Sequence, residues 1–364
     1  MYKILRSILF LFTAENAHYL TVKILVVLRY IPLSQYFLKL IYGYNNPILE
    51  REVFGITFKN PVGLAAGFDK NGDLYNDMAK FGFSFVEIGS LTLNPQPGNP
   101  KPRAFRLLKD NAIINRMGIN NNGVRYAVEY LKNHKPNCII GGNLSKNTNV
   151  SNSNAPGNYE KSFAILYDFV DYFTINVSCP NVKDLTKLQD IENLSEIIDK
   201  LLALRRYFDD YRPILLKLSP DIPEQHLDEI IDLILVSGLD GVIATNSTRS
   251  RDGLTLPAEQ LNAIGDGGLS GQPLYERSLK MVQYINKKAN GQLPIIAVGG
   301  IMTPEQAQEM LDAGASLIQL YSGLIYNGPG LVKKINKHIA ANLVKKAKAK
   351  SAQNKNNTHD KKNI

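Results

Sequence analysis

Residues of a few reactive types recur at the ends of short apolar runs in this 364-residue chain. They fall at 65–70, 89–90, 143, 176–181, 217, 245–247, 299–300 and 321–323, and they include lysines, asparagines, serines, one cysteine and paired glycines. Each alone has an ordinary structural explanation, such as a solvated lysine or a turn glycine. If the apolar runs are parallel strands of one barrel, however, these residues meet at one rim, where such folds place their active sites.

Cys179 is the best candidate for a base that abstracts a proton, because no histidine falls at the end of a strand. A thiolate can act as a base when nearby cations lower its pKa, and Lys70 and Lys217 are expected at the same rim. A free cysteine is also commonly a small core residue. The chain has only one other cysteine, Cys138, which excludes a disulfide scaffold, a four-cysteine zinc site and an iron–sulfur cluster held by this chain alone.

Lys217 lies inside an apolar run, ILLKL, where a buried ammonium needs a negatively charged partner. A reduced flavin carries such a charge on its pyrimidine side, and a fixed lysine would stabilise it. A catalytic Schiff-base lysine fits the same position in a barrel. Both interpretations stay open on the residues alone. The five histidines are scattered, so no metal-ligand spacing is present and no metal site is expected.

Glycines and small residues cluster where phosphate sites recur in barrels. Gly299 and Gly300 end the seventh apolar run, 321–323 (YSG) end the eighth, and a further glycine-rich loop lies at 267–271 (GGLSG). Backbone N–H groups after the last two strands commonly hold a phosphate in this fold. The pattern predicts a phosphorylated cofactor or substrate at this part of the rim, although turn glycines needed only for tight loops would look the same.

The elements that must position these residues alternate along the chain. Apolar or β-branched runs predict strands at 62–66, 84–89, 138–144, 172–178, 213–218, 241–245, 294–299 and 316–321. Helical patterns fall at about 72–81, 120–133, 158–170, 190–208, 223–237, 274–290, 303–313 and 329–344. Eight strands that alternate with helices predict an α/β fold, a (β/α)₈ TIM barrel. An open doubly wound sheet is the alternative, but no G-x-G-x-x-G follows the first strand.

Residues 1–46 form a distinct N-terminal segment, in which 29 residues are apolar. Charged residues interrupt it throughout, so no run is long enough to span a bilayer. Two short helices, at 16–30 and 33–43, are expected to lie on a membrane as an interfacial pair, or to cap the main domain with their apolar face. We therefore divide the chain into 1–46, a barrel at 47–344 and a tail at 345–364.

The net charge of +9 resides at the two ends of the chain. The first 46 residues carry +4, the last 20 carry +6, and the 298 residues between them carry −1. A neutral body does not indicate a basic groove for nucleic acid, so no nucleic-acid partner is expected. The tail is rich in Lys, Asn and Ala without apolar periodicity, and we expect it to be disordered.

Nine sequence motifs carry a family resemblance. They are, in order, PVGLAAGFDKNG, EIGSLT, NPQPGNPKPRAFRL, NRMGINNNG, INVSCPN, IATNST, GGLSGQPL, VGGI and QLYSGLIYNGPG. Together they resemble the flavin-dependent dihydroorotate dehydrogenases from about residue 45 to 340. The helical N-terminal segment and the PQPGNPKPR stretch resemble the class 2 branch, which is associated with membranes and reduces quinones.

The resemblance implies a barrel that binds FMN and oxidises (S)-dihydroorotate to orotate in pyrimidine (UMP) synthesis, with a quinone as the final acceptor. By motif, FMN is expected at Ala66, Gly67, Ser90, Asn143, Asn176, Lys217, Thr245, Gly271, Gly300, Tyr321 and Ser322. The substrate is expected at Lys70, Asn115, Arg116, Met117, Gly118, Ile119, Asn176, Asn181, Asn246 and Ser247. The implied base is Cys179. The implied location is peripheral, on the cytoplasmic face of a bacterial inner (cell) membrane, with the quinone entering near the N-terminal helices.

The catalytic loop departs from the class 2 pattern. Members of that class generally carry Ser at the base position and Thr after the following Pro-Asn, whereas this chain has Cys179 and Val182. The SCPNV string resembles the soluble class 1 enzymes, in which Cys is the base. Two alternatives therefore stay open: a class 1-type enzyme that uses fumarate or a partner subunit linked to NAD, and a non-catalytic, membrane-docked barrel that binds metabolites.

Overall fold

Eight parallel strands close into a barrel in the computed structural model, which describes residues 2–180 and 185–360. The strands are β3 (Val62–Leu64), β4 (Phe85–Leu91), β7 (Ile139–Leu144), β8 (Tyr172–Asn176), β9 (Ile214–Leu218), β10 (Gly241–Ala244), β12 (Ile295–Val298) and β13 (Leu317–Leu320). Each strand pairs with the next in chain order, and β13 pairs with β3 to close the ring. All eight expected strands are present, and the (β/α)₈ fold is confirmed in place of the open sheet.

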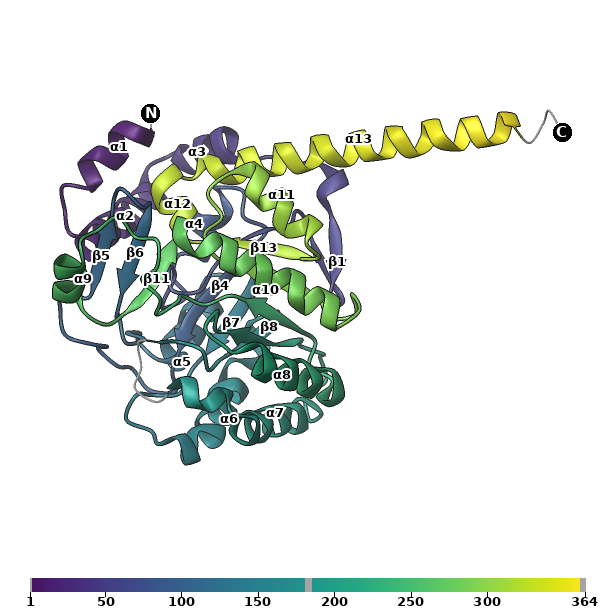
Figure 1. The fold of residues 1–364 in the computed structure, drawn as a ribbon. Helices are drawn as coiled ribbons and strands as arrows, with labels where there is room; N and C mark the ends of the chain where they lie inside the picture. The colour runs from purple at the N-terminus through teal and green to yellow at the C-terminus, as the bar shows by residue number, and fades with distance from the viewer. Residues whose placement is uncertain (1, 181–184, 361–364) are drawn as a thin grey trace.

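Helices form the outer layer of the barrel (Figure 1). They are α4 (Tyr75–Ala79), α5 (Val124–Asn133), α6 (Ala155–Leu166), α7 (Ile191–Arg205), α8 (Glu224–Ser237), α10 (Tyr275–Lys288), α11 (Pro304–Asp312) and α13 (Gly330–Asp360). These correspond to the eight expected helical stretches. Two shorter helices, α9 (Ala258–Ile264) and α12 (Ser322–Asn327), were not expected. Helix α12 begins directly after the last barrel strand, so it lies at the rim.

The amino end of the barrel is filled with aromatic rings. Phe85 and Tyr172 lie inside the barrel, and a Cβ on Gly63 or Gly141 would come within 2.2 Å of one of these two rings. Phe58 packs on Phe85 with ring centroids 5.2 Å apart, which places the small hairpin β1 (Arg51–Val53) and β2 (Ile56–Phe58) across this end. These rings and the hairpin therefore close the barrel interior at its amino end, and the interior opens at the carboxyl ends of the strands.

A three-stranded antiparallel sheet, absent from the sequence expectations, adjoins the carboxyl rim. It consists of β5 (Ala104–Leu107), β6 (Ala112–Asn115) and β11 (Gly268–Gly271), in the order β11-β6-β5. Each strand has only four residues, so none shows a run long enough to be recognised from its pattern. The sheet matters because Asn115 ends β6 and Gly271 ends β11, which brings both residues to the pocket described below.

Three helices precede the barrel: α1 (Tyr2–Leu9), α2 (Ala14–Tyr30) and α3 (Ser34–Tyr42). The second and third match the two expected helices, whereas α1 was missed. An eight-residue helix is marginal by itself. The barrel holds it in place, because Arg6 donates to the Tyr326 carbonyl at 2.9 Å and Phe10 packs edge-on against the Tyr326 ring.

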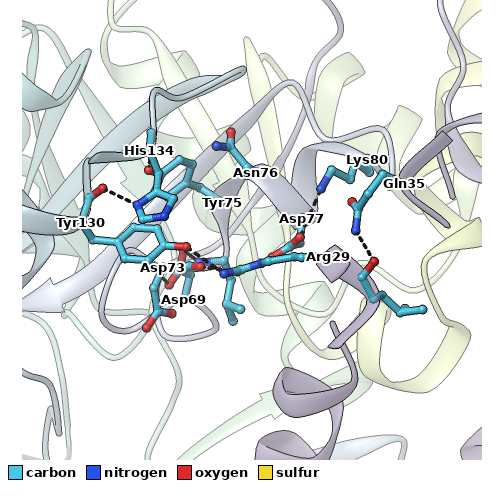
Figure 2. Close-up of polar contacts among 12 residues, drawn as sticks. Arg29, Gln35, Asp69, Asp73, Tyr75, Asn76, Asp77, Lys80, Tyr130 and His134 are labelled. Atoms are coloured by element: carbon cyan, nitrogen blue, oxygen red, sulfur yellow. Dashed lines mark hydrogen bonds and ion pairs between the residues drawn. The ribbon is translucent and has the colours of Figure 1, made fainter. Parts of the chain in front are cut away.

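Helix α2 is fixed to the barrel by a partly buried polar cluster around Arg29. Figure 2 shows the Arg29 side chain reaching between α4 and α5. Its Nε donates to Asp77 Oδ2 at 2.8 Å, Nη1 donates to the Tyr130 hydroxyl at 2.8 Å and Nη2 donates to the Asp73 carbonyl at 2.5 Å. At the other end of α2, Arg103 Nη2 donates to Glu15 Oε1 at 2.8 Å. The helix is thus held at both ends by charged hydrogen bonds.

The C-terminal segment differs from the expected disordered tail. Helix α13 continues through Asp360 and projects beyond the body of the molecule (Figure 1). The tail lacks apolar periodicity, but it also lacks glycine and proline after Gly330, and it is rich in Ala and Lys. These residues have high intrinsic helix propensity, so a helix already started on the barrel can continue into solvent.

Candidate functional site

A pocket of about 1040 Å³ lies at the carboxyl end of the barrel. It gathers most of the residues expected from the sequence, namely Ala66, Gly67, Lys70, Ser90, Asn115, Met117, Gly118, Ile119, Asn176, Cys179, Lys217, Thr245, Asn246, Ser247, Gly271, Gly300, Tyr321 and Ser322. They come from the ends of seven barrel strands and from the three-stranded sheet. The shared position that motivated the site in the sequence is therefore present in the fold.

Three expected site residues are placed differently. Asn143 lies beneath the pocket, with its Nδ2 donating to Glu87 Oε1 at 2.7 Å. Arg116 turns its guanidinium away, toward the carbonyls of Ile264 and Asp266, so its side chain does not line the pocket. Asn181 lies outside the described residues. Both carbonyls accept from Arg116 Nη1, which holds the end of this side chain on the loop before β11.

Hydrogen bonds interlock the amide and hydroxyl groups on one wall of the pocket. Asn176 Nδ2 donates to Ser90 Oγ at 2.7 Å, and Asn246 Nδ2 donates to Asn176 Oδ1 at 3.3 Å. Asn246 Nδ2 also donates to Ser178 Oγ at 3.0 Å. These bonds join the ends of β4, β8 and β10. A fixed row of amides offers alternating donors and acceptors, which suits a planar ring that carries amide groups.

Cys179 lies three residues after Asn176 in the chain and lines the pocket from the segment after β8. It is partly exposed and forms no disulfide. A thiol at the surface of a ligand pocket is accessible for proton transfer, unlike a cysteine buried in the core. Cys138 does not line this pocket, and partial burial raises the pKa of its thiol to about 12.

Lys217 and Glu87 form an ion pair at the floor of the pocket. The Lys217 Nζ lies 3.7 Å from Glu87 Oε1, and both side chains are almost fully buried. The Glu87 carboxylate also accepts from Asn143 Nδ2 and from Gln319 Nε2, each at 2.7 Å. The Tyr172 hydroxyl donates to Glu87 Oε2 at 3.3 Å from the amino-end side of the barrel. A buried carboxylate with four polar partners can hold the end of a buried lysine side chain at a fixed place.

Burial shifts the pKa values of Lys70, at the pocket, and of its neighbour Asp69. Burial lowers the pKa of Lys70 to about 8, although the Glu15 carboxylate opposes this shift. Its neighbour Asp69 is fully buried and accepts from the backbone N–H groups of Asp73 and Leu74, each at 2.9 Å. Burial, with the charge of Asp73, raises the pKa of Asp69 to about 7. The loop carrying Lys70 is thereby anchored to the start of α4.

Two glycines allow the backbone to close around the far side of the pocket. Gly300 has a φ of +70°, and a Cβ there would lie 2.6 Å from the Tyr275 nitrogen and 2.7 Å from the Gly271 oxygen. Gly271 has a φ of +107°, and a Cβ there would lie 2.3 Å from the Asn111 oxygen. Only glycine fits these positions. Ser322 and Ser270 add hydroxyls 3.1 Å apart on the same side, which makes a polar cradle of backbone and hydroxyl groups.

A second pocket, between α2 and the barrel, adjoins the first. It has a volume of about 880 Å³, and Lys70, Met117 and Asn120 line both pockets. Aromatic rings connect the two: His18 packs edge-on against Phe68 at 5.1 Å, and Phe68 packs against Tyr321 at 6.2 Å. Burial, helped by the charge of Lys70, lowers the pKa of His18 to about 3. The second pocket therefore presents a neutral imidazole and the Phe68 ring, beside polar and charged side chains that include Asp73 and Arg103.

Comparisons with known proteins identify the family that carries this site. The family model for dihydroorotate dehydrogenase matches residues 48–343. The chain belongs to the dihydroorotate dehydrogenase family. A protein of Christiangramia forsetii named dihydroorotate dehydrogenase (quinone) is 48% identical over 340 residues, which cover 93% of this chain and 98% of that protein. A protein of the same name from Coxiella burnetii is 43% identical, with 92% and 95% covered.

Solved structures of the family show the same fold. A crystal structure of DHODH from Eimeria tenella in complex with ferulenol has a TM-score of 0.78 and 34% sequence identity, and the match covers 87% of this chain and 91% of that chain. The ligand-free enzyme of the same organism has a TM-score of 0.78 and 35% identity, with 86% and 93% covered. Dihydroorotate dehydrogenases are flavin-dependent enzymes.

Three polar residues at this pocket were missed in the sequence: Glu87, Gln319 and Asn120. Glu87 had a usable signal, since a carboxylate inside the apolar run FVEIG poses the same problem as the lysine in ILLKL. The two opposite charges in buried strands could have been paired. Gln319 and Asn120 had no such signal, because neutral amides are common in this chain.

Proposed function

We propose that this protein oxidises (S)-dihydroorotate to orotate, with FMN as the hydride acceptor and a quinone as the final electron acceptor, in pyrimidine (UMP) biosynthesis. The observation that carries the proposal is the pocket itself. One wall consists of interlocked amides beside Cys179, and the floor holds a paired lysine. A family model that spans residues 48–343 supports the same activity.

The residues around the pocket fit FMN. Lys217 would face the flavin edge that gains negative charge on reduction, and the cradle at Gly271, Gly300 and Ser322 would hold the phosphate through backbone and hydroxyl donors. Two buried acceptors near the floor, Asn143 Oδ1 and Gln319 Oε1, have no hydrogen-bond partner within the described parts of the chain. When bound, the flavin would accept a hydride and pass the electrons on.

The residues at the substrate would have two roles: one removes a proton, and the others bind and orient the substrate. The Cys179 thiolate would remove the proton from the ring carbon next to the carbonyl, while the neighbouring carbon that bears the carboxylate loses a hydride, so that a carbon–carbon double bond forms. Lys70 would hold the substrate carboxylate. Asn115, Asn176 and Asn246 would bind the ring amides and fix the orientation that both transfers need.

The second pocket is the proposed quinone site. The part of its lining that His18, Val22 and Phe68 form suits a neutral aromatic ring, and burial keeps the imidazole uncharged. Tyr321 lines the flavin pocket and contacts Phe68, so the two ligands would be separated by only a thin aromatic wall. Such a short separation suits electron transfer from one site to the other.

The N-terminal helices are the proposed membrane contact. Among the described residues, fifteen of the 23 exposed large apolar side chains lie within 1–46, and they include Ile4, Leu11, Val27, Phe37 and Leu40. No single described helix is long and apolar enough to cross a bilayer, while α2 and α3 together pass that test but bend by 118°. An apolar surface of this extent fits peripheral docking on the cytoplasmic face of a bacterial cell membrane, with the quinone entering beside α2.

Flavin bleaching tests the proposed oxidation. The purified protein should be yellow, and its flavin absorbance should bleach when dihydroorotate is added without oxygen. A Cys179→Ala variant should retain the flavin and bind the substrate but bleach far more slowly, because it lacks the base. Absence of bleaching in the parent protein would favour the non-catalytic barrel that binds metabolites.

A further inference from the structure

The exposed part of α13 is strongly basic and lies outside the barrel. Residues 344–350 are all exposed, and four of the last six of these are lysines: Lys345, Lys346, Lys348 and Lys350. From Gly330 to Asp360 the only acidic residue is Asp360 itself. The proposed activity uses none of these lysines, because the pockets lie at the barrel rim and beside α2.

The base of α13 is fixed to the apolar N-terminal helices. Lys333 Nζ donates to the Ile41 carbonyl at 2.7 Å, at the end of α3, and Lys337 Nζ lies 5.9 Å from the centre of the Tyr44 ring. In Figure 1, α1, α3 and α13 lie along the same edge of the molecule, and α13 projects past the body. The lysine-rich segment therefore extends from the edge that exposes Tyr36, Phe37 and Leu40.

We propose that residues 345–350 of α13 bind the anionic headgroups of a lipid bilayer while helices α1–α3 rest on the same bilayer. The proposal rests on the membrane docking put forward above and adds a second, electrostatic contact. A bilayer with anionic lipids matches both features of this edge, since it accepts apolar side chains and attracts lysines. Nucleic acid would match only the lysines, and the barrel between the two basic ends is close to neutral.

The lysines are arranged for attraction at the surface rather than for insertion. At about 100° per residue, Lys345 and Lys348 are neighbours on the helix surface, as are Lys346 and Lys350, so the four lysines form one broad basic side. The residues between them are Ala347 and Ala349, so the segment offers no large apolar side chain for insertion. Lys346 also lies 3.0 Å from Asp312, but both side chains are more than half exposed, and an exposed pair of this kind competes weakly with headgroups. The segment would lie among headgroups and draw its affinity from charge.

The test is vesicle binding by the full, flavin-loaded protein. One set of vesicles contains phosphatidylcholine only, and the other also contains phosphatidylglycerol. The parent protein should bind the anionic vesicles more tightly, and the K345Q/K346Q/K348Q/K350Q variant should lose at least tenfold of this gain, since a lysine at an anionic surface contributes about fivefold. Added salt should abolish the same gain.

Two control variants isolate the role of the tail. The K132Q/K135Q/K161Q/K280Q variant makes the same charge change at exposed lysines of the barrel and should keep the gain. The K345R/K346R/K348R/K350R variant keeps the positive charge of the tail and should therefore also bind the anionic vesicles more tightly. An undiminished gain in the glutamine tail variant would overturn the proposal. Failure of the parent protein to bind phosphatidylcholine vesicles would instead count against docking by α1–α3, while a gain that depends on the tail lysines would still support this inference.

Discussion

At the scale of single residues, Cys179 defines the chemistry of the site. It lies in the pocket beside the amide wall, at the position where class 2 relatives are expected to carry serine. A thiol ionises far more readily than a hydroxyl, so a cysteine base stays active at lower pH. We predict that Cys179→Ser moves the acid limb of the kcat profile to higher pH. Measured kcat profiles of the two proteins that superimpose would contradict this role.

We expect the affinity for the substrate to fall at alkaline pH because Lys70 loses its charge. Its folded-state pKa is lowered to about 8, so the ammonium is present below pH 8 and is lost as the pH rises through that value. Because the charged form would hold the substrate carboxylate, we predict that the KM for dihydroorotate rises about tenfold per pH unit above this pKa. In a Lys70→Arg variant that still binds substrate, the guanidinium stays charged and this rise should be absent. A flat KM in the parent protein would show that Lys70 does not bind the carboxylate.

Glu87 and Lys217 should depend on one another. Replacing Glu87 with Gln leaves the Lys217 ammonium buried without its counter-charge, which we expect to lower the free energy of unfolding by about 3 kcal/mol and to reduce the bound flavin. The double variant Glu87→Gln/Lys217→Met should recover part of that stability, because no charge is then left buried. Denaturant unfolding of the single and double variants measures the coupling. Strictly additive losses would exclude the pairing.

At the scale of residues, sequence patterns predicted most of the pocket lining and Lys217 at its floor, but missed Glu87, the ion-pair partner of Lys217. The motif positions reached the pocket because they follow strands whose carboxyl ends meet. Arg116 shows the limit of this reasoning: its position in the chain is near the pocket, yet its side chain bonds to the carbonyls of Ile264 and Asp266. Rotamer choice depends on neighbours that are distant in sequence, and no spacing rule reveals it.

At the scale of elements, the Arg29 cluster couples α2 to the barrel. Arg29→Ala removes bonds to Asp77, Tyr130 and the Asp73 carbonyl (Figure 2). Since α2 forms one wall of the second pocket, we predict a several-fold rise in the KM for a quinone analogue, with the rate of flavin bleaching by dihydroorotate unchanged. Lys23→Ala, on the exposed side of the same helix, serves as the matched control. Equal KM values for the parent protein and Arg29→Ala would contradict the coupling.

The elements that sequence patterns predicted and those that they missed differ in length and in the contacts that stabilise them. The eight barrel strands are buried on both faces, so they read as continuous apolar runs. The β1–β2 hairpin turns through Phe54 and Gly55, with φ values of 56° and 76°, and a phenylalanine is an unusual residue for such a turn. Helix α1 depends on Arg6 and Phe10 contacts with residues more than 300 positions away. Contacts of that kind leave no local pattern.

At the scale of the whole molecule, function follows the division of charge and apolar surface. A nearly neutral barrel holds the proposed redox site, an apolar helical edge covers the second pocket, and a basic helix projects from that edge (Figure 1). The arrangement suits an enzyme that takes a water-soluble substrate at one pocket and a membrane-soluble acceptor at the other. The Cys179 loop is the one feature that favours a soluble class 1-type acceptor instead.

The choice of electron acceptor tests the central claim most directly. The purified protein with dihydroorotate should be supplied in parallel with a soluble quinone analogue, with fumarate and with NAD⁺, and orotate formation should be followed in each case. We predict rapid turnover with the quinone and little or none with fumarate or NAD⁺, because His18, Val22 and Phe68 give part of the second pocket an uncharged lining. Rapid turnover with fumarate and none with the quinone would contradict the account.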